Sequence, residues 1–204
     1  MKKKAKIETK RCYTYGEFLK LFPFCSSDHQ KELLKQLEGA KKPTFFAGAE
    51  VPDDLNLVTY GMLDDLSNIS QSGLPDPMAQ AIAKILCIDT EKVYEANVFD
   101  VFGISKWIGS EVERINKLFK GISPRFSSQE IAAGVKAINF GSFGVLDWYS
   151  HRQGIADQNE VRDVAWIRIF TCMKNDNIKA EYEKRLNQVY SKQYSNGSRS
   201  QRRH

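Results

Sequence analysis

The stretch TYGMLDDLSNIS, from Thr59 to Ser70, opens the part of the sequence in which helical signals become regular. Its apolar residues occupy positions i, i+1, i+4 and i+7, which share one face of an α-helix: Met62, Leu63, Leu66 and Ile69. Gly73 and Pro75 follow, and these residue types end helices. The stretch therefore predicts an amphipathic helix that begins just after Thr59.

Helical signals continue from here to Val189. Asp76 and Pro77 suit the cap and the first position of the next helix, and Ser127 with Glu130 forms a capping-box pattern. The expected helices are one from Pro77, a short one near residue 90, a long one over about Val98–Lys120 with Asn97 as its cap, one after Ser127, a short one ending at Gly154, and a last one from Trp166 to Val189. Breaks are expected at GSFG (141–144) and near NDN (175–177). The sequence predicts a mainly α, multi-helix bundle.

The first part of the chain has a mixed character. Alternating residues over Lys6–Tyr13 favour a short β-strand, and SSDHQKELLKQLEG (26–39) favours a helix. The stretch KKPTFFAGAEVPDDL (41–55) is rich in Pro and Gly and indicates extended or loop structure. We therefore expect a mixed α/β or extended segment over 1–55, a helical domain over 56–190, and a disordered basic tail over 191–204.

The positive charge of the chain lies at its two ends. The net charge is +5; residues 1–11 carry six cations against one acid, and residues 191–204 carry four cations and no acid, which leaves 12–190 at −4. A nucleic-acid-binding domain places cations on a structured face among aromatic side chains. We therefore expect no nucleic-acid partner, except through the basic termini.

The sequence contains no apolar run of about 18 residues, and no apolar segment follows the basic N-terminus. We therefore expect no membrane association and a cytoplasmic location. The four cysteines (Cys12, Cys25, Cys87 and Cys172) lie far apart and far from the histidines, so we expect buried reduced thiols, no metal site and no cofactor.

The tripeptide Thr-Tyr-Gly occurs twice, at Thr14 and at Thr59, and a leucine follows each threonine by seven residues. The recurrence of this tripeptide has three interpretations: an internal repeat, a ligand-binding loop used twice, or two helix starts capped by threonine. A phosphate-binding loop needs more glycines and a nearby Lys or Arg, and neither copy has them. Because the flanking residues show no further repeat, we interpret the copies as two helix starts in which glycine allows close backbone approach.

No catalytic constellation is evident, so we expect no enzymatic activity. Ser142, Asp147 and His151 have the residue types of a hydrolase triad, but no strand-to-helix turn presents the serine. Asp147 and His151 are four residues apart on a predicted helix, which favours an ordinary surface contact.

Aromatic residues gather in the second half of the chain, and their helical spacing favours core packing, with an exposed groove for a partner helix as the alternative. They are Trp107, Phe119, Phe140, Phe143, Trp148, Tyr149, Trp166 and Phe170. The candidate partner-binding residues are Tyr15, Tyr60, Trp107, Trp148 and Trp166.

The order of these features resembles the tail assembly chaperones of tailed bacteriophages. The resemblance runs from about Val51 to Val189 and is most specific at DWYSHRQGIADQNEVRDVAWIRIFTCMKNDNIKAEYEKRL (147–186). There a short helix with Trp precedes a Gly-Ile link, an acidic cap, a VAW sequence and a charged final helix. The first fifty residues have no counterpart in it.

The resemblance implies a non-enzymatic protein that binds the aggregation-prone, helical tape-measure protein in the host cytoplasm and helps to recruit tail-tube subunits. Two alternatives are a structural virion protein, such as a head–tail connector, and a nucleic-acid-binding protein that uses the basic termini. The sequence predicts neither the partner's identity nor the oligomeric state.

Overall fold

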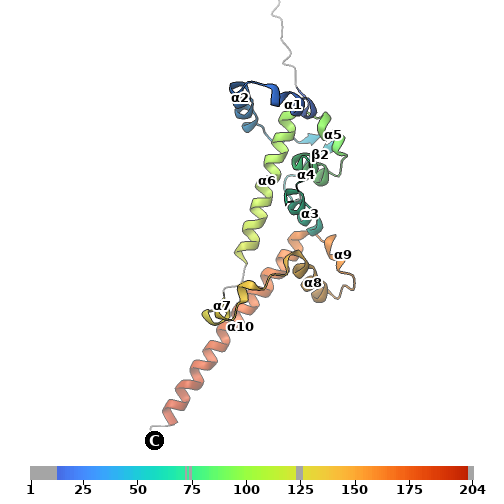
Figure 1. Ribbon diagram of the computed structural model, residues 1–204. Coiled ribbons are helices and arrows are strands. Elements are labelled where there is room, and N and C mark those ends of the chain that lie inside the picture. Colours follow the sequence, from blue (N-terminus) through green and yellow to red (C-terminus); the bar gives the residue numbers. More distant parts are fainter. Residues whose placement is uncertain (1–12, 72, 74, 123–125, 202–204) are drawn as a thin grey trace, which may run out of the picture. The chain divides into compact units, whose positions relative to one another are not determined.

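The mainly α prediction is confirmed by a computed structural model (Figure 1), which describes residues 13–71, 73, 75–122 and 126–201, with side chains to Gln193. The α-helices in this part of the chain are α1 (Tyr15–Leu21), α2 (Ser27–Glu38), α3 (Tyr60–Gln71), α4 (Pro77–Leu86), α5 (Thr90–Glu95), α6 (Val98–Gly121), α7 (Ser128–Ala132), α8 (Gly141–Gln153), α9 (Gln158–Arg162) and α10 (Trp166–Gln201). Two short 3-10 helices are η1 (Phe22–Phe24) and η2 (Val135–Ala137). None of the described helices combines the length and the apolar character needed to cross a bilayer.

The β-structure differs from the prediction. Strands β1 (Phe45–Phe46) and β2 (Ala49–Glu50) form an antiparallel hairpin inside the stretch that we expected to be extended or loop. Ala47 and Gly48 both have positive φ, as a tight two-residue hairpin turn requires. Most of the strand expected over Lys6–Tyr13 lies outside the described residues, and Tyr13 itself is not in a strand.

The predicted helix caps at Asp76 and Ser127 are confirmed, whereas the predicted breaks between helices are not. The Asp76 side chain accepts a hydrogen bond from the Ala79 amide, and Ser127 forms a complete capping box with Glu130. The expected break at GSFG is wrong, because α8 begins at Gly141. The break expected near NDN is also wrong, because α10 continues through it to Gln201. The same helix includes residues 191–201 of the tail that was expected to be disordered, and residues 202–204 lie outside the described residues. Once a helix is nucleated, each further residue costs little, so polar residues without proline extend it.

The chain divides into two compact units that do not follow the expected boundary at residue 56. The first unit contains the described residues up to Val58 together with Met62–Arg114. The second contains Thr59–Gly61 and the described residues from Ile115 onward. Three residues of the second unit therefore lie, in sequence, between two parts of the first.

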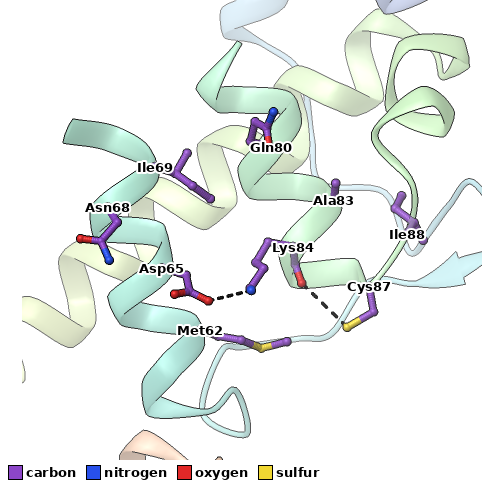
Figure 2. Close-up of a pocket in the computed structure, with 9 residues that line it drawn as sticks. All are labelled: Met62, Asp65, Asn68, Ile69, Gln80, Ala83, Lys84, Cys87 and Ile88. Carbon is purple, nitrogen blue, oxygen red and sulfur yellow. Dashed lines mark hydrogen bonds and ion pairs between the residues drawn. The ribbon is translucent and has the colours of Figure 1, made fainter. Parts of the chain in front are cut away.

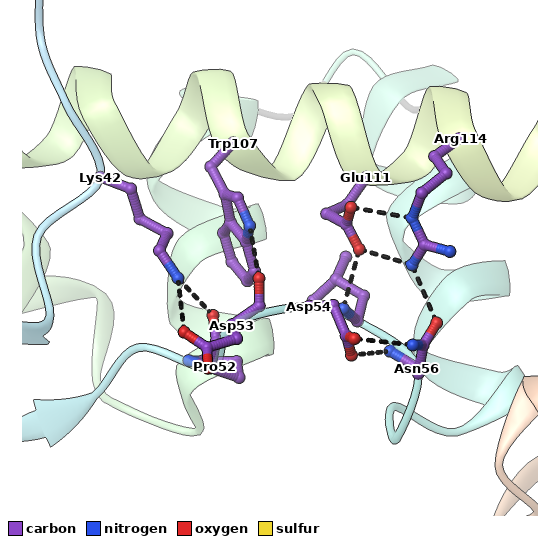
Figure 3. Close-up of polar contacts among 9 residues, drawn as sticks. Lys42, Pro52, Asp53, Asp54, Asn56, Trp107, Glu111 and Arg114 are labelled. Atoms are coloured by element: carbon purple, nitrogen blue, oxygen red, sulfur yellow. Dashed lines mark hydrogen bonds and ion pairs between the residues drawn. The ribbon is translucent and has the colours of Figure 1, made fainter.

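In the first unit, a polar cluster attaches the loop after β2 to helix α6 (Figure 3). The Glu111 carboxylate accepts hydrogen bonds from the Leu55 amide at 3.0 Å and from Arg114 at 2.6 Å. Arg114 also donates to the Asn56 side chain at 2.9 Å. The Arg114 guanidinium lowers the pKa of Glu111, so the carboxylate stays charged and holds the loop. Leu55 is fully buried beside this cluster.

In the second unit, the core forms where α8 and α9 pack against the first turns of α10. Its buried members are Leu146, Tyr149, Val161 and Ile169. Trp166 is also fully buried, and its ring centroid lies 5.9 Å from that of Phe119. The Phe119 ring packs edge to face on Phe170, with a centroid distance of 5.4 Å. The last turns of α6 thus complete this core.

The two units contain the same sequence of local structures. In the first unit, α4 ends at Cys87 in the left-handed conformation, Asp89 precedes α5, and α6 follows. In the second, α8 ends at Gly154 in the left-handed conformation, Asp157 precedes α9, and α10 follows. Each helix end closes with the same backbone bond, from Ile88 to Ala83 at 3.1 Å and from Ile155 to Ser150 at 2.9 Å.

Each Thr-Tyr-Gly element belongs to one of these copies. Thr14 forms an isolated antiparallel bridge with Asn97, and Thr59 forms one with Ala165. The Tyr15 amide donates to Ala96 and the Tyr60 amide donates to Val164, both at 2.8 Å. Buried residues match at a shift of 68 positions: Val93 with Val161, Val98 with Trp166, and Val101 with Ile169. The chain therefore contains an internal structural repeat, which the residues flanking the two elements do not reveal.

Candidate partner-binding surfaces

Tyr15 lies in the core of the first unit, with 3% of its surface exposed. Its ring stacks on Tyr94 with a centroid distance of 6.0 Å, and its hydroxyl donates to the Asp76 carboxylate at 3.0 Å. Burial, with the neighbouring Asp76 carboxylate, raises the pKa of the Tyr15 hydroxyl, so the group remains a donor. Tyr15 thus joins the start of α1 to the start of α4, and it presents almost no surface to a partner.

Tyr60 is half-buried and packs against the core cluster of the second unit. The glycines that follow the two tyrosines lie against the short helix of their copy, Gly16 against α5 and Gly61 against α9. A Cβ on Gly16 would lie 3.2 Å from the Tyr94 carbonyl oxygen, and one on Gly61 would lie 3.0 Å from the Arg162 carbonyl oxygen. The glycines therefore serve close helix packing, which is one of the two roles considered from the sequence.

Trp107 lies half-buried on α6 and participates in the contacts that hold the loop after β2 (Figure 3). Its indole donates to the Asp53 carbonyl at 3.3 Å, and the Lys42 ammonium lies 4.9 Å from the ring centroid. Lys42 also donates to the Pro52 carbonyl at 2.7 Å. Trp107 thus helps to hold this loop against α6, and partner contact by its remaining surface stays a prediction.

Trp148 and Trp166 occupy different environments in the second unit. Trp166 is fully buried at the start of α10 and has no exposed surface to offer a partner. Trp148 is half-buried on α8, with the Arg152 guanidinium 5.8 Å from its ring centroid. Of these two residues, only Trp148 presents surface.

Asp147 and His151 form the ordinary surface contact that their spacing predicts. The His151 Nδ1 atom lies 2.8 Å from the Asp147 carbonyl oxygen and 3.5 Å from its carboxylate, and the His151 side chain is 77% exposed. An exposed imidazole that contacts its own helix is unlike the buried, oriented base of a hydrolase.

A pocket between α3 and α4 of the first unit is open to solvent and lined by residues of both helices (Figure 2). Its most polar feature is an ion pair between Lys84 and Asp65 at 2.6 Å. Met62, Ile69 and Ile88 supply apolar walls. Because the two opposite charges bind each other, the pocket has the character of a packed helix seam rather than a ligand site. In the part of the chain that the structure describes, no group of three or more His, Cys, Asp or Glu residues could hold a metal ion.

The expectation of buried thiols is only partly met. Cys25, Cys87 and Cys172 are free; Cys87 is exposed, and the other two are half-buried. Cys12 lies outside the described residues.

An exposed apolar cluster lies where the sequence favoured core packing, in keeping with the alternative of an exposed surface. Ile138, Phe140 and Phe143 are 63%, 72% and 60% exposed at the start of α8. Helical spacing placed the two phenylalanines in the core, but the buried face of α8 runs through Leu146 and Tyr149 instead. The glycines at 141 and 144 were the available signal, since a glycine beside each phenylalanine adds no side chain to a core. We call Ile138, Phe140 and Phe143 the Phe140 edge.

Comparison with family models, with curated proteins and with solved structures finds no match for this chain.

Proposed function

We propose that this chain is a non-enzymatic protein-binding protein of the tail assembly chaperone kind, which covers apolar stripes of a helical tape-measure protein before tail assembly. The observation that carries the proposal is the Phe140 edge, where three large apolar side chains within six residues face solvent. The resemblance of residues 51–189 to tail assembly chaperones supports the choice of partner.

The physical basis is the burial of apolar area. Large aromatic side chains dominate the energetics of protein interfaces, and each exposed phenylalanine offers a broad surface with few rotamers to order. An amphipathic helix that lies across the edge would bury its own apolar face there as well. Trp148, half-buried on the same helix α8, is a further contact candidate.

The test is co-production of the chain with a candidate tape-measure protein, the product of a very long helical open reading frame close to the gene for this chain. We expect the chain to keep the tape-measure protein soluble and to co-purify with it. The double variant Phe140→Ser/Phe143→Ser should reduce the co-purified amount at least about tenfold, because two interface anchors are lost.

The matched control is Phe24→Ser/Leu57→Ser, which removes two side chains that are 88% and 86% exposed on the first unit. This control should leave co-purification unchanged. Equal losses in both variants, or a tape-measure protein that stays insoluble with the unaltered chain, would argue against the proposal.

Two further measurements separate the alternatives. Mass spectrometry of purified virions tests the structural-protein alternative, because an assembly chaperone is absent from mature particles. DNA binding measured across a salt series tests the nucleic-acid alternative, because binding through basic termini weakens steeply as salt rises and disappears when residues 1–12 and 191–204 are removed.

A further inference from the structure

Helix α10 carries an apolar stripe that its own unit leaves uncovered. Ile178, Tyr182, Val189 and Tyr190 are 57%, 56%, 50% and 50% exposed, and Leu186 is half-buried. The adjacent face of the helix meets the rest of the second unit, where Asn177 donates to the Ile122 carbonyl. A groove with Phe126 lies on that side, and Ile178, Glu181 and Arg185 border it, so the start of the stripe and one charged flank adjoin this groove. In Figure 1, α10 extends well beyond α7.

The stripe stays on one side of a straight helix. Ile178 and Val189 are eleven residues apart, which is close to three turns at 3.6 residues per turn. Tyr182 and Leu186 follow Ile178 at spacings of four, and Tyr190 widens the far end. A helix with this pattern gains most of its stability from packing its apolar face against another element.

The charges beside the stripe indicate what covers it. One flank carries Glu181 and Arg185, and the opposite flank carries Lys179 and Glu183. Lys179 and Glu183 approach each other to 4.0 Å along the helix. In both pairs the opposite charges are four residues apart, and each pair is centred one residue from Tyr182.

These charges are complementary between two copies of the helix that run antiparallel to each other. In an antiparallel pair of helices related by a two-fold axis, each flank faces the same flank of the second helix. With the axis at Tyr182, Glu181 would face the second copy's Arg185, and Lys179 would face the second copy's Glu183. Ile178 would pack on the second copy's Leu186 in the same arrangement.

We propose that α10 pairs with α10 of a second copy of this chain, antiparallel and with the two-fold axis at Tyr182. The interface is isologous, so every contact occurs twice. With the axis at Tyr182, the two apolar stripes overlap from Ile178 to Leu186, about 12 Å at 1.5 Å per residue, and Val189 lies level with Asn175 of the second copy. An interface of this length is small, so the dimer forms as concentration rises.

Sedimentation equilibrium on the full chain over a range of concentrations tests the pairing. The weight-average mass should rise from 23.3 kDa toward twice that value. Tyr182→Ser/Val189→Ser should weaken the dimer at least about tenfold, since two stripe residues on each helix are lost. The control Asn187→Ala/Gln188→Ala alters exposed residues away from the stripe and should dimerise like the unaltered chain.

Charge exchange tests the orientation. Glu181→Lys places a lysine opposite the second copy's Arg185 and should weaken the dimer several-fold, whereas Glu181→Lys/Arg185→Glu restores opposite charges and should recover it. Circular dichroism on each variant verifies that α10 remains helical, because the exchange also affects neighbours within one helix. A chain that stays monomeric overturns the proposal, as does dimerisation that Tyr182→Ser/Val189→Ser leaves intact or a charge exchange that restores nothing.

The pairing does not depend on the proposed chaperone function, and the two are separable. If the chain is monomeric and Tyr182→Ser/Val189→Ser instead reduces co-purification of the tape-measure protein, the stripe belongs to that partner and self-pairing is wrong. If the dimer forms while Phe140→Ser/Phe143→Ser leaves co-purification unchanged, the pairing stands and the chaperone proposal fails.

Discussion

At Gly61 the backbone comes so close to Arg162 that any larger residue would have to displace it. A Cβ at this position would lie 3.0 Å from both the Arg162 carbonyl oxygen and its Cβ, and backbone atoms cannot swing aside as the end of a flexible side chain can. Next to this contact, the Tyr60 amide donates a hydrogen bond to the Val164 carbonyl at 2.8 Å.

We therefore expect Gly61→Ala to lower the free energy of unfolding by about 1–3 kcal/mol, the usual cost of overpacking. Gly109→Ala is the matched control, because a Cβ on Gly109 would meet nothing within 4 Å. It should raise stability by about 0.5–1 kcal/mol through helix propensity. Urea unfolding of both variants provides the measurement, and a stabilising Gly61→Ala would contradict the close contact.

The sequence predicted the role of these glycines correctly but not their contacts. A glycine two residues after a helix-start threonine indicates close backbone approach, and the structure identifies Tyr94 and Arg162 as the neighbours. Those residues lie 78 and 101 positions away along the chain. No local pattern encodes contacts over such distances, which is also why buried Tyr15 and Trp166 were candidates for partner contact.

At the level of helices, the two copies of the repeat differ at one informative position. Both α4 and α8 end at a residue in the left-handed conformation, with φ of 52° at Cys87 and 69° at Gly154. Glycine adopts this conformation without strain, whereas a residue with a Cβ is disfavoured by roughly 1–2 kcal/mol.

Cys87→Gly should therefore raise the free energy of unfolding by about 0.5–1 kcal/mol. The gain is smaller than the strain that is removed, because glycine also raises the conformational entropy of the unfolded chain. The reverse change, Gly154→Ala, should lower it by about 1 kcal/mol. Thermal unfolding of the two variants under reducing conditions is the measurement. A destabilised Cys87→Gly variant would mean that the thiol contributes more than its backbone conformation costs.

Helix starts were more predictable from the sequence than helix ends or the repeat. Asp76, Ser127 and Asn97 all cap the helices they were expected to cap, because capping is a contact within three residues. An internal repeat was considered from the sequence and set aside, because the repeat preserves burial and backbone hydrogen bonds more than residue identity. Ile82 corresponds to Tyr149, for example, and both are buried.

At the scale of the whole chain, Thr59–Gly61 must pack in a different unit from the residues on either side of them. These three residues complete the second unit, although the sequence on both sides of them belongs to the first. Tyr60 and Tyr15 are equivalent in the repeat, and each packs within its own unit.

Tyr60→Ala should therefore speed amide hydrogen exchange in peptides from 141–173 by about thirtyfold or more, corresponding to a loss of roughly 2 kcal/mol or more, and leave peptides from 77–104 protected. Tyr15→Ala should do the opposite. Mass spectrometry of the exchanged peptides distinguishes the two patterns. Equal loss of protection everywhere in both variants would mean that the chain unfolds as one cooperative body rather than as two units.

The position of Thr59 also determines the order of events during synthesis. Its bridge partner, Ala165, follows 106 residues later, so at 5–20 residues per second the segment waits roughly 5–20 s on the ribosome for its contact. Contacts between distant parts of a chain also form slowly after release. During that interval the Thr-Tyr-Gly segment of one nascent chain can be captured by the matching site of a neighbour. High expression should consequently favour domain-swapped dimers, and slower translation before Ala165 should increase them.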